Sequence, residues 1–280
     1  MFGITFSGRF SLDAVFCKCN GKPMAIFICL DNQSMDIVYY DIFSKENYQY
    51  WKIFLLKLKT IININAIEQF FVTDGKQGLH QALEEIFPNI PRQLCVAHKT
   101  RRICQIIPRV RGDKIDKMVF RIGINCITAK SEETFHKQKN ILIQLFKSSW
   151  YEKQPKPHKE KIKKVLGAVR YQQKYLNTRF KLPDLIKDDI TTNPLECVNG
   201  IIKERIKLFR GFKKKNNARL IIKLIILYYR FHKFTGSKFK HRNGKRPIEL
   251  NKIKNKKYLQ KVLKKDHPFY WMVEIKNHSF

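Results

Sequence analysis

One continuous stretch constrains the fold of this chain more than any other: residues 70–102 read FFVTDGKQGLHQALEEIFPNIPRQLCVAHKTRR. Its apolar beginning predicts the end of a buried strand, and Asp74, followed by glycine, stands directly where that strand stops. Apolar residues at helical spacing over 78–87 predict a helix, which Pro88 ends. A second short strand is expected over 92–96. The stretch therefore predicts a strand, a carboxylate, a helix and a further strand in close succession.

The end of this second strand carries a C-x2-H pair, Cys95 and His98. Thiolate and imidazole are common zinc ligands, but a structural zinc site needs four ligands, and the sequence contains no second C-x2-C or H-x3-H pair. We therefore expect a structural or substrate-positioning role for the two residues. A basic helix is predicted to begin directly after them.

Three strands are predicted before the first helix. They cover residues 4–15, 24–30 and 35–43, with a strong Asn-Gly hairpin signal between the first two. Ser44 is the expected N-cap of a helix that continues to about residue 59. With the stretch described above, the order is three strands, helix, strand, helix, strand, helix, which predicts an α/β domain.

The second half of the chain is predicted to be helical. Residues 113–187 show helical stripes and no convincing strand, although the Lys/Pro-rich segment 150–164 is expected to loop out because its prolines forbid a continuous helix. Two further helices are expected, one ending near residue 210 and one over 218–234. The tail from residue 236 is basic and weakly patterned.

The charge of the chain is the strongest compositional signal. A formal net charge of +33 arises from 56 Lys and Arg residues against 23 Asp and Glu residues, and the basic residues are spread over the whole chain. A charge of this size favours a polyanionic partner, and interleaved aromatic residues favour nucleic acid. The alternative is a basic structural protein of the ribosomal type.

The remaining composition predicts an intracellular, soluble protein. Seven cysteines without regular spacing argue against a disulfide framework and for a reducing compartment. The sequence contains no apolar run of the ~20 residues that a membrane span needs and no secretory signal. A membrane partner is therefore not expected.

Three carboxylates stand out because this chain is poor in acids. Asp13 lies within an apolar strand, Asp74 follows a strand, and Glu196 lies beside apolar residues of a late helix. If the first and fourth strands are neighbours and the late helix crosses them, the three side chains can meet. Clustered carboxylates need cations, and a pair of Mg²⁺ ions, with Mn²⁺ able to substitute, would suit phosphodiester chemistry. Taken one at a time, each acid also fits an ordinary structural role.

Two segments of this sequence resemble a known family. VTDGKQGLHQALEEIFPNIPRQLCVAHKTRRI is similar to the D-G, F-P, Q-C-x2-H-x2-R segment of Mutator-like and related insertion-sequence transposases, and TTNPLECVNGIIKERIKLFRGF is similar to the block around their third catalytic acid. The resemblance extends from residue 12 to about 232. It implies a DDE transposase with an RNase H-like fold, a mixed five-stranded sheet flanked by helices, and an all-helical insertion before the last catalytic helix.

The resemblance implies catalytic and metal-binding roles for Asp13, Asp74 and Glu196, and it places the C-x2-H pair near the active site. The family carries its first acid on the first strand, which selects Asp13 over three alternatives that remain open, namely Asp31, Asp36 and Asp41. The implied organisation is a catalytic domain over 1–112 and 191–235, a helical insertion over 113–190 and a basic tail over 236–280.

Several basic and polar residues are candidates for DNA contact. They belong to the helix after the C-x2-H pair and to the segment around Glu196, and they are Lys99, Arg101, Arg102, Asn199, Lys203, Arg205, Arg210, Lys213, Lys214 and Lys215. Asn199 and Lys203 share the helical face of Glu196 and could instead orient the carboxylate. Trp150 could stack on a flipped base, but a place in the core is the favoured interpretation.

The resulting hypothesis is metal-dependent DNA strand cleavage and strand transfer at transposon ends, on transposon and target DNA, by a homo-oligomer assembled on DNA. The location would be the cytoplasm and nucleoid of a prokaryote or the nucleus of a eukaryote. Alternatives are a domesticated or truncated transposase-derived protein that binds DNA without catalysis, and an RNase H-like nuclease. Met1 lies 12 residues before Asp13, so we expect no separate DNA-reading domain and little sequence preference.

Overall fold

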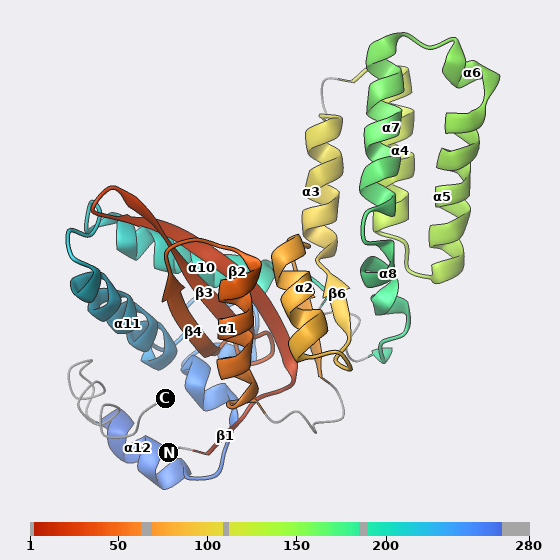
Figure 1. Cartoon of the computed structure of the whole chain (residues 1–280). Helices are drawn as coiled ribbons and strands as arrows, with labels where there is room; N and C mark the ends of the chain where they lie inside the picture. The colour runs from red at the N-terminus through yellow and green to blue at the C-terminus, as the bar shows by residue number, and fades with distance from the viewer. Residues whose placement is uncertain (1–2, 63–68, 109–111, 185–189, 265–280) are drawn as a thin grey trace. The chain divides into compact units, whose positions relative to one another are not determined.

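The computed structural model describes residues 3–62, 69–108, 112–184 and 190–264 of the chain (Figure 1). It shows an α/β protein whose chain divides into two compact units. The first unit comprises Met1–Phe71, Lys76–Ile90 and Asn193–Phe280, and the second comprises Val72–Gly75 and Pro91–Thr192.

A mixed five-stranded sheet has the strand order β4-β3-β2-β5-β6. The hairpin of β2 and β3 and the pairing of β3 with β4 are antiparallel, which confirms the predicted meander. Asn20 and Gly21 form the hairpin turn with φ angles of 50° and 72°, the left-handed conformation that such two-residue turns require. The strands are β2 (Arg9–Cys19), β3 (Lys22–Asp31), β4 (Ile37–Phe43), β5 (Phe70–Thr73) and β6 (Arg92–Leu94).

In the first unit, helices cover both faces of the sheet (Figure 1). Side chains alternate along a strand, so Leu12 and Ala14 of β2 face one side and Val15 faces the other. The first face packs against α1 (Tyr48–Lys59) and α2 (Gln77–Ile86). The second packs against α10 (Asn193–Lys207) and α11 (Lys215–Phe231). Asp13 lies two residues before Val15, so its side chain is on the same face of the sheet, which α10 covers.

The cap of α1 differs from the prediction. Asn47, not Ser44, is the N-cap, and its side-chain oxygen accepts a hydrogen bond from the Tyr50 N–H at 2.9 Å. Ser44 instead donates its hydroxyl to the Tyr50 side chain. Both residue types cap helices well, so the sequence alone did not distinguish the two.

The second unit contains a helical core. Its helices are α3 (Val96–Ile106), α4 (Lys114–Ile127), α5 (Glu132–Lys147), α6 (Ser149–Glu152), α7 (Lys156–Arg170) and α8 (Gln173–Leu176), followed by the 3₁₀ turn η1 (Asn177–Phe180). Within the range predicted to be helical, residues 114–180 are mostly helical, and residues 185–187 lie outside the described part. Trp150 packs partly buried against this core, in agreement with the favoured interpretation.

The expected loop over 150–164 is wrong, because most of that segment belongs to α6 and α7. Pro155 is the N-cap of α7 and Pro157 lies in its first turn. Proline is tolerated at these positions because the first N–H groups of a helix have no intrahelical acceptor. Buried Ile162 and Val165 then fix α7 in the core.

The C-terminal segment is more ordered than its weak pattern predicts. It forms η2 (Lys240–Arg242), η3 (Pro247–Leu250), β7 (Lys252–Ile253) and α12 (Lys256–Lys264), and β7 pairs antiparallel with β1 (Ile4–Thr5). Ile248 and Leu259 are buried against α11 in the first unit. Residues 265–280 lie outside the described part. No helix in the described ranges has the length and apolar character that a membrane span requires.

Candidate functional site

Two of the three predicted acids are carried by elements that pack together in the first unit. Asp13 lies on β2, and its Oδ2 accepts a hydrogen bond of 2.9 Å from the side-chain amide of Asn199 on α10. Glu196 precedes Asn199 by one helical turn, so the two residues share a face of α10. The contact between β2 and α10 thus joins the strand of Asp13 to the helix of Glu196.

A lysine that the sequence did not single out lies beside Asp13. The Nζ of Lys76 is 3.8 Å from Asp13 Oδ1 and 2.7 Å from a carboxylate oxygen of Glu46. The same ammonium lies 5.5 Å from the ring centroid of Phe16. The only sequence signal for Lys76 was its position two residues after Asp74. Asp13 thus has a cation and an amide donor as neighbours, and its side chain is only 18% exposed.

The donor set around Asp13 fits a divalent cation of the Mg²⁺ type. Asn199 is 4% exposed, and its side-chain oxygen is buried without a hydrogen-bond partner. A buried acceptor without a donor normally costs free energy. Carboxylate and amide oxygens are the ligands that such hard cations prefer, so this oxygen is suited to face a cation or its hydration water.

Asp74 emerges where β5 ends, as the sequence predicted. The Phe70 N–H donates to the Gly8 carbonyl at 3.0 Å, which holds the beginning of β5 beside the beginning of β2. Gly75 follows with a φ of +93°, and a Cβ there would lie 2.9 Å from the side chain of Leu94. Glycine is therefore required directly after the acid. Asp74 belongs to the second unit, whereas Asp13 and Glu196 belong to the first.

Asp31, one alternative for the first acid, has a structural role. It is fully buried, and its carboxylate accepts hydrogen bonds from the backbone N–H groups of Ser7 at 2.6 Å, Gln33 at 3.0 Å and Ser34 at 2.9 Å. Burial raises the pKa of this carboxyl group, and the hydrogen bonds oppose that effect. Asp31 thus fixes the turn that follows β3.

The other two alternatives are also engaged elsewhere in the first unit. Buried Asp36 binds Arg230 through two hydrogen bonds of 2.7 and 2.9 Å and accepts a third from Asn251 at 2.9 Å. Asp41 pairs with Lys57 at 2.8 Å. Of the four acids considered for the first catalytic position, Asp13 is therefore the one that forms a hydrogen bond with α10 in the described part of the chain.

The C-x2-H pair forms a small network in the second unit, directly after a strand that ends two residues earlier than predicted. The strand β6 ends before Cys95, which is the N-cap of α3. The Cys95 sulfur accepts hydrogen bonds from the His98 N–H at 3.4 Å and from the N–H and hydroxyl of Thr192, both at 3.2 Å. Thr192 Oγ1 also lies 3.1 Å from His98 Nδ1. These hydrogen bonds lower the pKa of the Cys95 thiol although burial raises it.

Lys99, predicted as a DNA contact, is largely buried in the second unit. It is 9% exposed, and its ammonium donates to the carbonyls of Ala168 at 3.0 Å and Tyr171 at 2.6 Å. Burial lowers the pKa of Lys99 to about 8. These contacts give Lys99 a structural role within the second unit, which the sequence did not indicate because the two carbonyls lie far from Lys99 in sequence. Arg101 and Arg102, by contrast, are exposed.

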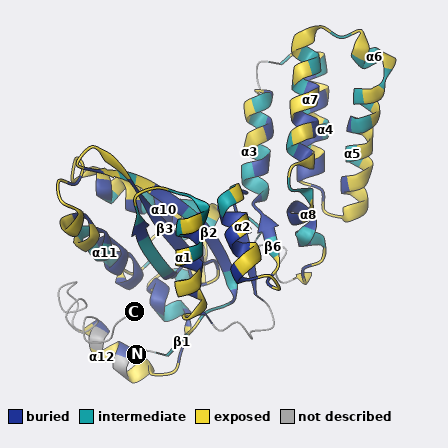
Figure 2. Ribbon diagram, in the orientation of Figure 1, coloured by how far each residue is buried: buried dark blue, intermediate teal, exposed yellow. Residues whose placement is uncertain are grey.

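The predicted basic residues after Glu196 are mostly exposed (Figure 2). Arg205 is the partly buried exception, and its guanidinium lies 5.1 Å from the ring centroid of Tyr228. Asn199, also predicted as a DNA contact, is buried against Asp13 instead. The exposed members are Lys203, Arg210, Lys213, Lys214 and Lys215.

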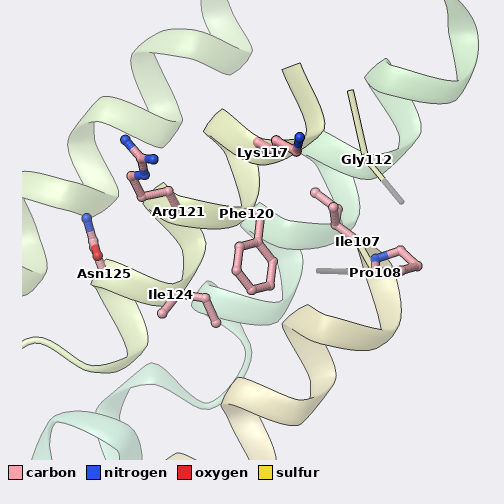
Figure 3. A pocket seen from close by; sticks show the side chains of 8 residues that line it. All are labelled: Ile107, Pro108, Gly112, Lys117, Phe120, Arg121, Ile124 and Asn125. Atoms are coloured by element: carbon pink, nitrogen blue, oxygen red, sulfur yellow. The ribbon is translucent and has the colours of Figure 1, made fainter. Parts of the chain in front are cut away.

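The second unit contains a cavity of about 270 Å³ between the end of α3 and α4 (Figure 3). Phe120 lies in it, with Lys117 and Arg121 at its edge. None of the predicted site residues lines this cavity. The cavity therefore adds nothing to the carboxylate site.

A group of possible metal ligands in the second unit was not anticipated from the sequence. Asp113, Asp116 and His158 place their ligand atoms within 4.8 Å of one another. However, the Lys161 ammonium already lies 2.5 Å from Asp116. The group is adequately explained as an ion-pair network between α4 and α7.

Comparison with known proteins gives two matches. Residues 17–232 match the family described as "Transposase, Mutator family". A curated relative, "Transposase for insertion sequence element IS1201" from Lactobacillus helveticus, is 22% identical over 223 residues, which cover 79% of this chain and 53% of that protein. The chain thus spans about half the length of this relative. The family match includes Asp74 and Glu196 and begins four residues after Asp13.

Proposed function

From the premise that this chain belongs to the Mutator family of transposases, we propose that it cleaves DNA strands at transposon ends and joins them to target DNA. In the first step, water opens a phosphodiester and leaves a 3′-hydroxyl. In the second, that hydroxyl attacks a target phosphodiester and displaces another 3′-oxygen, so each step exchanges one P–O bond for another. The observation that carries the proposal is the hydrogen bond between Asp13 and Asn199, because it ties the first acid to the helix of Glu196.

The proposed catalytic residues are Asp13, Asp74 and Glu196. Their carboxylates would hold two Mg²⁺ ions, which when bound stabilise charge on the attacking and leaving oxygens of a phosphodiester. The amide nitrogen of Asn199 donates to Asp13 and orients it, and the oxygen of the same amide is a buried polar group on the same side chain. Lys76 contributes a positive charge beside Asp13 and can pair with a phosphate.

An RNase H-like fold is part of the proposal. A central sheet whose first three strands form an antiparallel meander, followed by β5 next to β2 and by β6, is compatible with that fold. In this proposal the helices of residues 113–190 are an insertion that precedes the last catalytic helix. Fold alone does not establish activity, so the assignment depends on the site.

DNA is the proposed partner, in the form of transposon ends and target DNA, bound by a homo-oligomer. A net charge of +33 supports strong attraction to phosphates. Exposed Lys203 lies on the helix that carries Glu196, and exposed Arg210 and Lys213 lie in the turn that follows this helix, which supports a DNA-binding surface that continues along the helix away from the acids.

The proposal is tested by incubating the purified chain with labelled double-stranded transposon ends, with and without Mg²⁺. We expect metal-dependent nicking by the wild type and none by the Asp74→Asn and Glu196→Gln variants, with DNA binding retained. Retained nicking in either variant would exclude that residue as catalytic. A wild type that binds DNA but never cuts it would support the alternative of a DNA-binding protein without catalysis.

A further inference from the structure

The turn between α10 and α11 exposes large apolar side chains in an unusually basic setting. Leu208 is 80% exposed, which is the highest value among the exposed large apolar residues of the described chain, and its neighbour Phe209 is 46% exposed. Single exposed apolar residues are common on protein surfaces. Two adjacent exposed apolar residues at the end of a helix are less common, and the contacts of the turn determine how firmly they are held.

The backbone of this turn is fixed by hydrogen bonds. The N–H groups of Leu208, Phe209 and Arg210 each donate to a carbonyl three residues earlier, at 3.3, 3.1 and 3.0 Å, which tightens the end of the helix. Arg210 and Gly211 then adopt φ angles of 48° and 99°. This left-handed pair reverses the chain direction and leaves Leu208 at the outside of the turn.

The far side of the turn is anchored to the β2–β3 hairpin. Phe212 donates its N–H to the Lys18 carbonyl at 3.2 Å and accepts from the Asn20 N–H at 2.6 Å. Its side chain is buried in the core under α10 and α11. Phe209 stacks on it, with ring centroids 6.0 Å apart. The exposed pair is therefore presented on a rigid base, not on a loose loop.

Cationic residues flank this apolar tip on both sides in the sequence. Residues 203–215 contain seven Lys and Arg residues and a single acidic residue, Glu204. Six of the seven are exposed, and they are Lys203, Lys207, Arg210, Lys213, Lys214 and Lys215. An exposed apolar pair flanked by exposed cations suits a partner whose surface is anionic and whose interior offers apolar, stackable groups, as nucleic acid does.

We propose that this turn is a DNA wedge: Leu208 and Phe209 insert beside unstacked bases while the surrounding cations contact phosphates. DNA-binding proteins use apolar wedges of this kind at base steps that they distort, and stacking of a base on an aromatic ring stabilises the complex without reading sequence. The inference rests on the proposed function, since it assigns a role in holding DNA that is distorted during cleavage.

A second copy of the chain is a poorer partner for the same surface. Two such turns facing each other would bring their exposed cations together, and like charges repel at short range. A phosphate backbone instead neutralises them and releases counterions. The charge of the turn therefore favours nucleic acid over self-association.

The test compares the binding of the full chain to a fully paired duplex and to a duplex of equal length with a short central mismatch containing 2-aminopurine. We expect the wild type to prefer the mismatched duplex by about tenfold or more, as one stacked base would provide, and to raise the 2-aminopurine fluorescence. Leu208→Ala with Phe209→Ala should remove the preference and leave the salt dependence of binding unchanged. Leu208→Ala alone should fold normally, because the Leu208 side chain is 80% exposed. It therefore tests the preference for mismatched DNA even if the double variant misfolds.

Leu220→Ala is the matched control, because Leu220 is 54% exposed on α11 but lies outside the turn. It should behave as the wild type does. A double variant that keeps the full preference for mismatched DNA overturns the wedge while leaving DNA binding intact. If the wild type binds no DNA, the proposed function is overturned as well. If the double variant changes only the oligomeric state, as measured by sedimentation, the turn is a contact between copies of the chain and the wedge is overturned.

Discussion

Exchanging single carboxylates for amides should separate catalysis from folding at the two acids that compete for the first catalytic position. Asp13→Asn retains an oxygen that can accept the Asn199 hydrogen bond of 2.9 Å. It loses the attraction to Lys76, which is 39% exposed and 3.8 Å away, and such pairs contribute about 0–1 kcal/mol. The free energy of unfolding should therefore fall by no more than about 1 kcal/mol.

Asp31→Asn should behave in the opposite way. In the wild type, one carboxylate oxygen accepts from Gln33 and from Ser34, and the other accepts from the Ser7 N–H at 2.6 Å. An amide has a single acceptor oxygen, so its NH₂ group would face one of these donors. Loss of a charge-assisted hydrogen bond costs about 1.5–3 kcal/mol, and an unsatisfied buried donor costs about 1–3 kcal/mol more. Relief of charge burial offsets part of this loss and leaves about 2–4 kcal/mol of destabilisation.

Urea unfolding followed by circular dichroism measures the stability of both variants, and nicking of a labelled transposon end measures their activity. Loss of a metal-binding carboxylate removes several kcal/mol of transition-state stabilisation, so Asp13→Asn should cut at least about a thousandfold more slowly. Asp31→Asn should cut normally at temperatures where it is folded. If Asp31→Asn is as stable as the wild type and inactive while Asp13→Asn cuts DNA, the assignment of the first acid is refuted.

Three further predictions address other parts of the chain. Arg210→Ala with Lys213→Ala should reduce the slope of log K against log salt concentration by roughly 1.8 in duplex binding, at about 0.9 per lost phosphate contact; an unchanged slope would exclude both contacts. Burial lowers the pKa of Lys99 from 10.5 to about 8, so between pH 8 and 10.5 the unfolded chain binds more protons than the folded chain. The free energy of unfolding of the wild type should therefore rise relative to that of Lys99→Met as the pH increases over this range. A difference in urea midpoints that does not change with pH would contradict this. Arg230→Met should lower the free energy of unfolding by about 3–5 kcal/mol, because it leaves Asp36 buried and unpaired, and a loss below about 1 kcal/mol in the same assay would disagree with that role.

Local patterns predicted much of the architecture. The meander followed from short segments rich in apolar, β-branched and aromatic residues and from the Asn-Gly turn, whose residues have the positive φ angles that this turn requires. The position of Asp74 at a strand end could likewise be predicted from the sequence, because an Asp-Gly pair ends the apolar run of β5. These features depend on neighbours within a few residues, which a single sequence displays.

The errors arose where distant residues or helix ends decide the outcome. Lys99 looked like a surface cation, but its ammonium binds carbonyls 69 and 72 residues away in sequence. Pro155 and Pro157 looked like helix breakers, but they stand at the beginning of α7, where proline is tolerated. Asn199 had two open roles, phosphate contact or carboxylate orientation, and only the packing of α10 on β2 directs it to Asp13.

The most direct test of the proposed active site is tethered hydroxyl-radical cleavage, in which Fe²⁺ replaces Mg²⁺ in the purified wild-type chain and ascorbate with peroxide generates radicals at the bound metal. We expect backbone cleavage near Asp13, Asp74 and Glu196, mapped by mass spectrometry. Excess Mg²⁺ should suppress this cleavage, and the Asp13→Asn variant should not show it. Cleavage elsewhere, such as around Asp113 and His158, or cleavage unaffected by Asp13→Asn, would contradict the claim that these three carboxylates hold the catalytic metal.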